Sequence, residues 1–313
     1  MGKIASVLVK LGLSALAIYL GLSVAAGIIL TEAALHPVRR PIADRAEFAA
    51  DAMHAANAPL QDVSIKATDG SLLKAWYVRP SLFLGSSVIL LHGVADNREG
   101  VSGYAWMFLR HGYAVLMPDS RAHGQSGGNI ATYGVLERDD INGWARWLKP
   151  QTPDCEYLFG ESMGAAIALQ SIARVPGLCA VAAEDPFESF REIAYDRIAE
   201  QTGIPEPWAR ILGSPAIEAG LLYARVRYGV RLARANPLLA ETHSRIPTLI
   251  ITGTADSNIP MRHSIALDRA AQDHATLWIV DGAEHTGAME VNPRAFENRV
   301  IQWFSAHQTP GPN

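Results

Sequence analysis

The sequence of 313 residues is poor in cysteine and in charge. Its two cysteines are too few for a disulfide framework or for a cysteine-rich metal site, so both are excluded. Charged residues make up 19% of the chain, and the net charge of −4 with a pI near 6.2 lacks the basic surplus that nucleic-acid binding needs. No internal repeat is present either. These absences predict a globular protein without a nucleic-acid partner.

One long hydrophobic run departs from this ordinary composition. Leu11–Leu30 contains no charge and has about the length that a helix needs to cross a bilayer core of roughly 30 Å. We expect a transmembrane helix or signal anchor over residues 11–31, after a short tail of residues 1–10. The alternative is a cleaved signal peptide, although its apolar region usually runs only about 7–15 residues. The protein would then be secreted or periplasmic. Basic residues flank the run on both sides, which leaves the side of the membrane open.

After this run, the chain alternates strand-like and helix-like segments. Residues 62–68 and 72–80 lie around the turn signal Asp69-Gly70 and predict an antiparallel pair of strands. Six short runs rich in Val, Ile and Leu then follow, at residues 86–93, 113–119, 156–160, 179–184, 247–253 and 275–280. Such runs are typical of strands buried on both faces of a parallel sheet. The pattern predicts an α/β fold with an eight-stranded, mostly parallel sheet flanked by helices.

The domain boundaries follow from the same pattern. We expect a linker over residues 32–58, the α/β domain over residues 59–308 and a flexible tail over residues 309–313. The helical insertion at about residues 187–240 is too long for an ordinary crossover and predicts a small cap over the carboxyl edge of the sheet. Its arginines alternate with Leu, Tyr and Val, which we interpret as a solvated helix face. A basic amphipathic helix lying on anionic lipid is the alternative.

The residues Gly160-Glu161-Ser162-Met163-Gly164 join a strand directly to a helical pattern. A serine on such a sharp turn projects its hydroxyl above the sheet, and Gly160 and Gly164 avoid side chains that would clash there. The helix that begins at Met163 offers backbone N–H groups and the positive end of its dipole to a developing oxyanion. Ser162 is therefore the candidate nucleophile.

A serine nucleophile needs a base and an orienting acid. His285 lies in the loop after the last strand, and Asp256 lies just past the strand before it. In a doubly wound sheet both loops open at the same edge as Ser162. We expect His285 to be the general base and Asp256 the orienting acid. Asp185 is a rival acid, although Pro186 indicates that its main role is to start the cap.

Two other residues near these loops are weaker candidates. His263 falls on the helix after the Asp256 loop, and Glu284, beside His285, is expected at the surface. Neither is expected to take part in the chemistry.

The oxyanion also needs an N–H donor from the loop after the third strand. His92-Gly93 begins that loop, and the glycine allows the backbone to approach the substrate closely. The amides of Val94 and Met163 are the expected donors, with Ala95 as the alternative if the loop is shifted by one residue. We expect His92 to stabilise the loop by hydrogen bonding.

Together these motifs resemble the α/β-hydrolase superfamily from about Asp62 to His307. The segments LLHGVADN, PDSRAHGQSGG, GESMG, GTADSNIP and GAEHTG occur in the family's order, and so do the nucleophile, acid and base. Ala122 stands where a glycine is usual, a departure that we expect to affect loop shape more than chemistry. The N-terminal span further resembles a membrane-anchored, serine-aminopeptidase-like branch, which includes esterases, lysophospholipid or monoacylglycerol lipases and thioesterases.

The residues and the resemblance predict a serine hydrolase that cleaves carboxylic esters through an acyl-enzyme on Ser162, without a metal or an organic cofactor. We expect a small acyl ester or a lipid-like substrate, because a helical cap and an adjacent membrane favour amphiphiles. An aminopeptidase is an alternative that needs an acid such as Asp185 or Glu188 to hold the substrate's amino terminus. An acyltransferase and a non-catalytic, membrane-tethered binding protein are the other two. Nothing in the sequence indicates an oligomeric state.

The two cysteines lie on strands that this fold makes neighbours. Cys155 and Cys179 each fall about five residues before the end of their strand. A cross-strand disulfide is geometrically possible if the domain lies outside the cytoplasm. Buried free thiols are the state that we expect.

Overall fold

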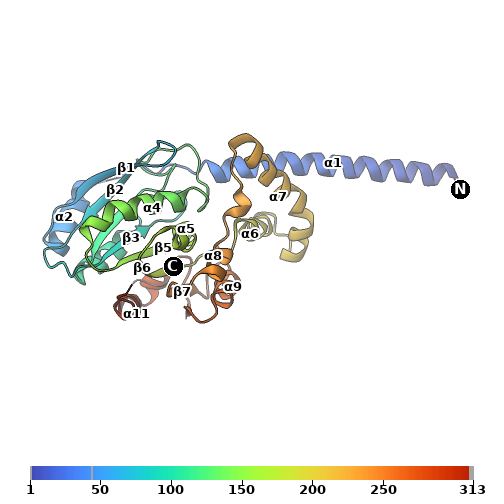
Figure 1. The fold of residues 1–313 in the computed structure, drawn as a ribbon. Coiled ribbons are helices and arrows are strands. Elements are labelled where there is room, and N and C mark those ends of the chain that lie inside the picture. Colours follow the sequence, from blue (N-terminus) through green and yellow to red (C-terminus); the bar gives the residue numbers. More distant parts are fainter. Residues whose placement is uncertain (1, 44, 310–313) are drawn as a thin grey trace. The chain divides into compact units, whose positions relative to one another are not determined.

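The computed structural model describes residues 2–43 and 45–309. The predicted tail at residues 309–313 therefore lies almost wholly outside the described residues. The chain divides into two compact units (Figure 1). One consists of His36–Ser189 and Ala235–Asn313, and we call it the sheet unit. The other consists of Met1–Leu35 and Phe190–Arg234, and we call it the helical unit.

The sheet unit is built on one eight-stranded sheet with the order β1-β2-β4-β3-β5-β6-β7-β8. Its strands are β1 Gln61–Lys66, β2 Leu72–Val78, β3 Ser87–Leu91, β4 Ala114–Pro118, β5 Glu156–Glu161, β6 Leu178–Glu184, β7 Thr248–Gly253 and β8 Ala275–Val280. β2 pairs antiparallel with both β1 and β4, and all the other pairs are parallel. The predicted fold class, including the opening antiparallel pair, is confirmed.

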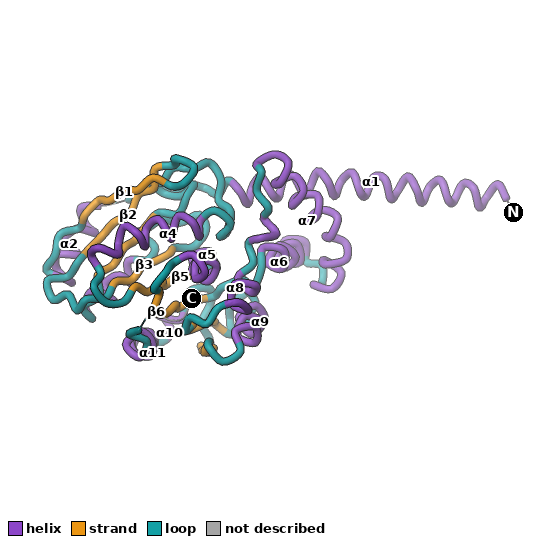
Figure 2. The backbone as a smooth tube through the Cα atoms, in the orientation of Figure 1, coloured by secondary structure: helices purple, strands orange, loops and turns teal. Residues whose placement is uncertain are grey.

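The central strands are buried and mostly apolar because helices cover both faces of the sheet (Figure 2). Val88 and Leu90 of β3 belong to one core cluster, whereas Ile89 and Leu91 belong to a second cluster on the opposite face. Residues of α2 Arg45–Ala56, α3 Ser102–Arg110, α10 Ala288–Val291 and α11 Pro293–Ala306 join the first cluster. Residues of α4 Glu137–Leu148, α5 Met163–Ser171, α8 Pro237–His243 and α9 Arg262–Ala271 join the second. The short 3-10 helices Lys149–Gln151 and Ile172–Arg174 end α4 and α5.

Helix α2 lies within residues 32–58, the segment predicted as a linker. Its Phe48 and Ala52 are buried in the first core cluster. The Phe48 ring lies 4.5 Å, centroid to centroid, from both Trp76 and Trp106. The aromatic contacts explain why this stretch folds onto the sheet although its composition resembles a connection.

The helical unit contains α1 Gly2–Leu35, α6 Phe190–Thr202, α7 Glu206–Tyr228 and the 3-10 helix Leu232–Arg234. The first helix is thus longer than the predicted residues 11–31 at both ends. Within the described residues, α1 is the one helix long and apolar enough to cross a membrane, a property that a signal sequence shares. Its buried positions Ser23, Gly27, Thr31 and Leu35 recur every fourth residue and form one face.

This face packs on α7 through small residues. Gly27 lies against the backbone of Ala216 and Gly220, and Gly220 in turn lies against Thr31. The Tyr19 hydroxyl donates a 2.7 Å hydrogen bond to the carbonyl of Leu212. Small residues allow two helix backbones to approach closely. The carboxyl half of α1 is therefore an integral part of the helical unit.

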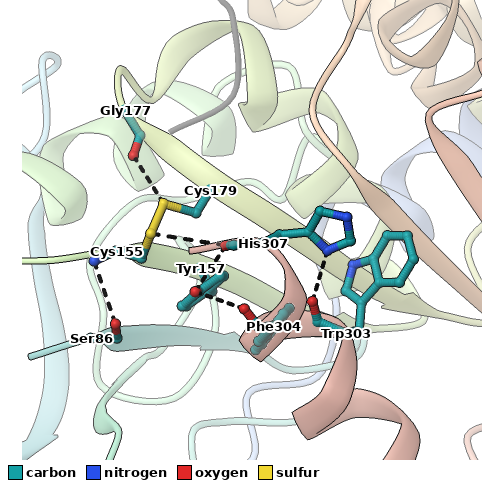
Figure 3. Close-up of a disulfide and its surroundings, with 8 residues drawn as sticks. All are labelled: Ser86, Cys155, Tyr157, Gly177, Cys179, Trp303, Phe304 and His307. Carbon is teal, nitrogen blue, oxygen red and sulfur yellow. Dashed lines mark hydrogen bonds between the residues drawn. A yellow bond between two sulfur atoms is a disulfide. The ribbon is translucent and has the colours of Figure 1, made fainter. Parts of the chain in front are cut away.

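Cys155 and Cys179 form a disulfide (Figure 3), so the expectation of free thiols was wrong. Cys155 directly precedes β5 and Cys179 lies at the start of β6, and their Cα atoms are 5.7 Å apart. Parallel pairing of β5 with β6 brings the two side chains into bonding range. Nearby, the Tyr157 hydroxyl lies 2.9 Å from the carbonyl of Phe304 at the end of α11.

Candidate active site

Ser162 occupies a sharp turn between β5 and α5. Its φ of 53° is unusual for a residue with a side chain, and its N–H donates to the Glu184 carbonyl at 2.8 Å. A Cβ on Gly160 would overlap the backbone of Gly164, and a Cβ on Gly164 would overlap the carbonyl oxygen of Leu91. Both glycines are therefore required by the close packing of the turn, as the sequence pattern predicted.

The structure brings Ser162, His285 and Asp256 into one hydrogen-bonded chain. The His285 Nε2 atom lies 2.9 Å from Ser162 Oγ, and its Nδ1 atom lies 2.8 Å from Asp256 Oδ2. Asp256 Oδ1 accepts hydrogen bonds from the N–H groups of Asn258 and Ile259, at 2.7 and 2.8 Å. These bonds hold the carboxylate while it holds the imidazole. The arrangement allows a proton to pass from the serine hydroxyl to the imidazole.

Asp185 also reaches this site, although Pro186 had indicated a role in starting the cap. Its side chain is buried at the end of β6, and its Oδ2 atom lies 4.0 Å from His285 Nδ1. That oxygen accepts a 2.7 Å hydrogen bond from the N–H of Thr286, and Oδ1 accepts one of 3.2 Å from the N–H of Gly253. Burial, followed by the charge of Asp256, raises the pKa of Asp185 to about 6.

The loop after β3 lies beside the serine. A Cβ built on Gly93 would be 3.6 Å from the Ser162 Cβ atom. His92 is buried, and its Nδ1 atom lies 2.7 Å from the Gly93 carbonyl, while its Nε2 atom accepts a hydrogen bond from the Ser120 N–H. Burial, followed by the neighbouring His123, lowers the pKa of His92 to about 4. A neutral His92 that donates from Nδ1 satisfies both contacts and braces the loop that leads to Val94.

The two residues expected to donate to the oxyanion lie on different segments, one in the loop after β3 and the other at the start of α5. Val94 follows Gly93 in the braced loop, and Met163 is the first residue of α5. Ala95, the alternative donor, adopts a positive φ of 59°. This left-handed conformation is uncommon for a residue with a side chain.

The loop after β4 braces the same edge of the sheet. Asp119 accepts from the guanidinium of Arg98 at 2.6 Å, and both side chains are buried. Arg121 makes a two-point contact with Asp140, each bond 2.7 Å long. Ala122 has a φ of 60°, the backbone conformation that a glycine adopts most easily. Ala122 holds this conformation at a cost in backbone strain.

Two buried carboxyl groups near Ser162, those of Glu161 and Glu184, were not predicted from the sequence. The Tyr104 hydroxyl lies 3.2 Å from Glu161 Oε2 and 2.9 Å from Glu184 Oε2. The N–H of Ala288 donates to Glu184 Oε1 at 3.0 Å. Burial raises the pKa of Glu161 to about 7 and that of Glu184 to about 8. The available signal was a glutamate as the last residue of each of two largely apolar strands, β5 and β6.

The weaker candidates lie apart from the reacting atoms. His263 is buried on α9, where its Nδ1 atom accepts a long hydrogen bond of 3.4 Å from the N–H of Glu188. The carboxylate of Glu188 is 2.9 Å from the guanidinium of Arg262. Glu284 is exposed, as expected.

Among the described residues, one group of three has ligand atoms close enough to hold a metal ion: Asp185, Asp256 and His285, within 4.8 Å of one another. Their atoms already have partners in the chain. The four carboxylate oxygens accept from backbone N–H groups or from His285, and the remaining nitrogen of His285 faces Ser162. The polar atoms of this group are therefore already engaged by hydrogen bonds within the chain.

Comparison with known proteins identifies a family and several relatives. A family model described as the alpha/beta hydrolase family matches residues 88–299. The uncharacterized protein YqkD of Bacillus subtilis is 28% identical over 236 residues, which cover 74% of this chain and 75% of the relative. The uncharacterized protein YfhR of Escherichia coli K12 is also 28% identical over 236 residues, covering 73% and 74% of the two chains.

Solved structures share the fold. The esterase Pf2001 of Pyrococcus furiosus superimposes with a TM-score of 0.68 at 22% identity, over 87% of this chain and 99% of that chain. The acylaminoacyl peptidase of Pyrococcus horikoshii superimposes with a TM-score of 0.60 at 15% identity, over 82% of this chain and 42% of that chain. Similarities at this level of identity extend to the fold alone.

Proposed function

Because the chain belongs to the alpha/beta hydrolase family, we propose that it is a serine hydrolase that cleaves carboxylic esters. Membership of the family supports hydrolase activity. The observation that carries the finer proposal is the chain of hydrogen bonds from Asp256 through His285 to Ser162, at 2.8 and 2.9 Å. In this proposal the three residues act as acid, base and nucleophile.

Acylation begins when His285 accepts the proton of the Ser162 hydroxyl through Nε2 and the serine oxygen attacks the ester carbonyl. Asp256 keeps the Nδ1 proton in place and stabilises the imidazolium that forms. The N–H groups of Val94 and Met163 donate to the oxyanion of the tetrahedral intermediate. The imidazolium then protonates the leaving alcohol, and the acyl group remains on Ser162.

Deacylation repeats these steps with water. His285 removes a proton from a water molecule, which attacks the acyl-enzyme and forms a second tetrahedral intermediate. Collapse of that intermediate releases the carboxylic acid, and His285 returns its proton to Ser162. In this scheme His285 accepts and returns each proton that is transferred.

The surroundings of the triad favour an ester over a peptide with a free amino terminus. An aminopeptidase needs an available carboxylate to bind the substrate ammonium group. Of the two acids considered for that role, Asp185 is buried with both oxygens hydrogen-bonded, and Glu188 pairs with Arg262. An acyltransferase would use the same triad with an alcohol or amine in place of water. We propose a small acyl ester or a lipid-like ester as the substrate.

Turnover of p-nitrophenyl esters of increasing acyl length tests the proposal, with the full-length chain in detergent. Ser162→Ala is expected to lower the rate by at least about 10³-fold and to abolish labelling by a fluorophosphonate probe. Ser64→Ala, at an exposed position of β1, is the matched control and is expected to keep both. Activity that survives Ser162→Ala, or no turnover of any ester, contradicts the proposal. Adding an alcohol acceptor separates hydrolysis from acyl transfer.

We further propose that α1 stays on the mature protein as a single-pass anchor and that the sheet unit lies outside the cytoplasm. The packing of Gly27 and Thr31 against α7 supports retention, because cleavage would uncover the small-residue face of α7. The disulfide between Cys155 and Cys179 supports an oxidising compartment. The intact mass of the membrane-extracted protein tests retention, and a mass that lacks α1 contradicts it. Thiol labelling of intact cells before and after reduction tests the compartment.

A further inference from the structure

We propose that Asp185 is a second acid for His285: it holds the loop of the base in place and shares the stabilisation of the imidazolium with Asp256. The inference rests on the proposed function, because it assigns a role in the same acylation step. The observation that carries it is the position of the buried Asp185 carboxylate, where the end of β6 meets the end of β7 and the loop that holds His285.

The first part of the role is mechanical. Asp185 directly follows β6, and its two oxygens accept hydrogen bonds from Gly253 at the end of β7 and from Thr286 in the loop of the base. Thr286 has a φ of 55°, and Asp185 itself has a φ of 49°. Residues with side chains adopt this conformation only when their surroundings hold them there. The short bond to Thr286, the residue next to His285, therefore determines where the imidazole lies.

The second part of the role is electrostatic. Asp185 Oδ2 and Asp256 Oδ2 lie 4.0 and 2.8 Å from the same Nδ1 atom of His285. The charges of Asp256 and His285 act on Asp185, and Asp185 acts in turn on the neighbouring Glu184. The positive charge that arises on His285 during acylation therefore lies within reach of both aspartates.

Two carboxylates beside one imidazole predict a particular response to mutation. Removing the charge of Asp185 makes the imidazolium of His285 less stable relative to the neutral imidazole. The base must be neutral to accept the serine proton, so kcat/KM rises with pH on the acid limb of its profile. In Asp185→Asn the rising limb is expected to move to lower pH by on the order of one unit. The plateau is expected to fall by about 10-fold, because the cation is less stable in the transition state.

The deciding experiment is a double-mutant cycle of Asp185→Asn and Asp256→Asn, with kcat/KM for a p-nitrophenyl ester measured from pH 5 to pH 9. If Asp185 takes over in part when Asp256 is lost, Asp256→Asn is expected to lose about 10²-fold. Where no second acid is present, the corresponding change costs about 10⁴-fold. Asp185→Asn is then expected to cost more in the Asp256→Asn background than in the wild type. Glu290→Gln, at an exposed position of α10, is the matched control.

A purely structural Asp185 gives a different pattern. In that case Asp185→Asn lowers the plateau and the melting temperature, the pH midpoint stays where it is, and the two substitutions act independently. That result overturns the inference. Should Asp185→Asn fail to fold, the residual activity of Asp256→Asn alone decides, and a loss near 10⁴-fold rejects a second acid. Activity that depends on Ser162 in all these variants separates failure of this inference from failure of the proposed function.

Discussion

Cys155 and Cys179 join β5 to β6 at the ends of these strands opposite to Ser162 and Asp185. The covalent link therefore joins the two strands that lead to the proposed nucleophile and the proposed second acid, at the ends far from both residues. It also closes a loop with a sequence separation of 24 residues. A loop of this length restricts the unfolded chain considerably.

Removing the disulfide is expected to lower stability and to preserve the chemistry. The double substitution Cys155→Ala with Cys179→Ala should lower the free energy of unfolding by about 3 kcal/mol, as measured by urea denaturation. Ester turnover at 25 °C should stay within about twofold of wild type, because the site lies at the far end of both strands. Reductant should destabilise the wild type and leave the variant unchanged. Equal stability of the two proteins without reductant would contradict the prediction.

The buried glutamates under Ser162 are expected to make stability depend on pH. Because the pKa of Glu161 is raised to about 7 and that of Glu184 to about 8, the folded state binds more protons than the unfolded state above pH 4.5. The free energy of unfolding should therefore fall as the pH rises from about 4.5 to 8. Each titrating group contributes at most about 1.4 kcal/mol per pH unit.

Glu184→Gln tests this dependence, because glutamine resembles the protonated glutamate and can keep the contacts to Tyr104 and Ala288. Urea denaturation at pH 5, 6.5 and 8 should give a flatter profile than wild type and a higher relative stability at pH 8. The surface substitution Glu290→Gln serves as the control. A profile as steep as that of wild type would show that Glu184 does not contribute.

Gly164, two residues after Ser162, is expected to tolerate no side chain. In Gly164→Ala the added methyl group overlaps the carbonyl oxygen of Leu91, which belongs to the backbone of β3 and cannot move aside easily. The free energy of unfolding should fall by about 1–3 kcal/mol. The turnover rate should fall by about 10²-fold or more, because Ser162 is displaced.

Gly103→Ala on α3 is the matched control, because the nearest atom to its added Cβ is the sulfur of Met289 at 3.9 Å. This substitution should raise stability by up to about 1 kcal/mol, since alanine favours a helix over glycine. Both variants are measured by urea denaturation and by ester turnover. Wild-type activity in Gly164→Ala would mean that the turn is less constrained than its contacts indicate.

The packing of α1 on α7 can be tested with two glycines of one helix. A side chain at Gly27 overlaps the backbone of Ala216, whereas no atom lies within 4 Å of a Cβ added at Gly21. Gly27→Leu should therefore separate α1 from α7 and expose α6 and α7 to limited proteolysis in detergent. Gly21→Leu adds the same hydrophobic side chain and should leave the pattern of fragments unchanged. Identical patterns for the two variants would mean that α1 does not need α7.

Much of the fold could be predicted because its signals are local. Apolar runs of strand length, separated by helical patterns, indicated six of the strands, and the turn signal Asp69-Gly70 indicated the antiparallel opening pair. The three residues of the proposed triad could be chosen because each follows the end of a strand, and parallel strands end at one edge of the sheet. The fold class needed no long-range information beyond this rule.

Other features depended on distances that no local pattern encodes. Phe48 lies in a segment that resembles a linker, and only its contacts with Trp76 and Trp106 make that segment part of the core. Asp185 was placed at the correct edge of the sheet, but its hydrogen bond to Thr286 spans 101 residues. Glu161 and Glu184 share a hydrogen-bond partner, the hydroxyl of Tyr104, which lies on a helix far away in the sequence.

The sequence by itself determined the order of strands and helices, the turn at Ser162 and the edge at which the chemistry is placed, because these follow from periodicity, glycine positions and chain connectivity. Tertiary structure alone decided that Cys155 meets Cys179, that α1 packs on α7 and that two aspartates approach one histidine. Each of these contacts depends on angstrom-level spacing between separate segments. That spacing is set by side-chain packing and by backbone hydrogen bonds across the whole unit.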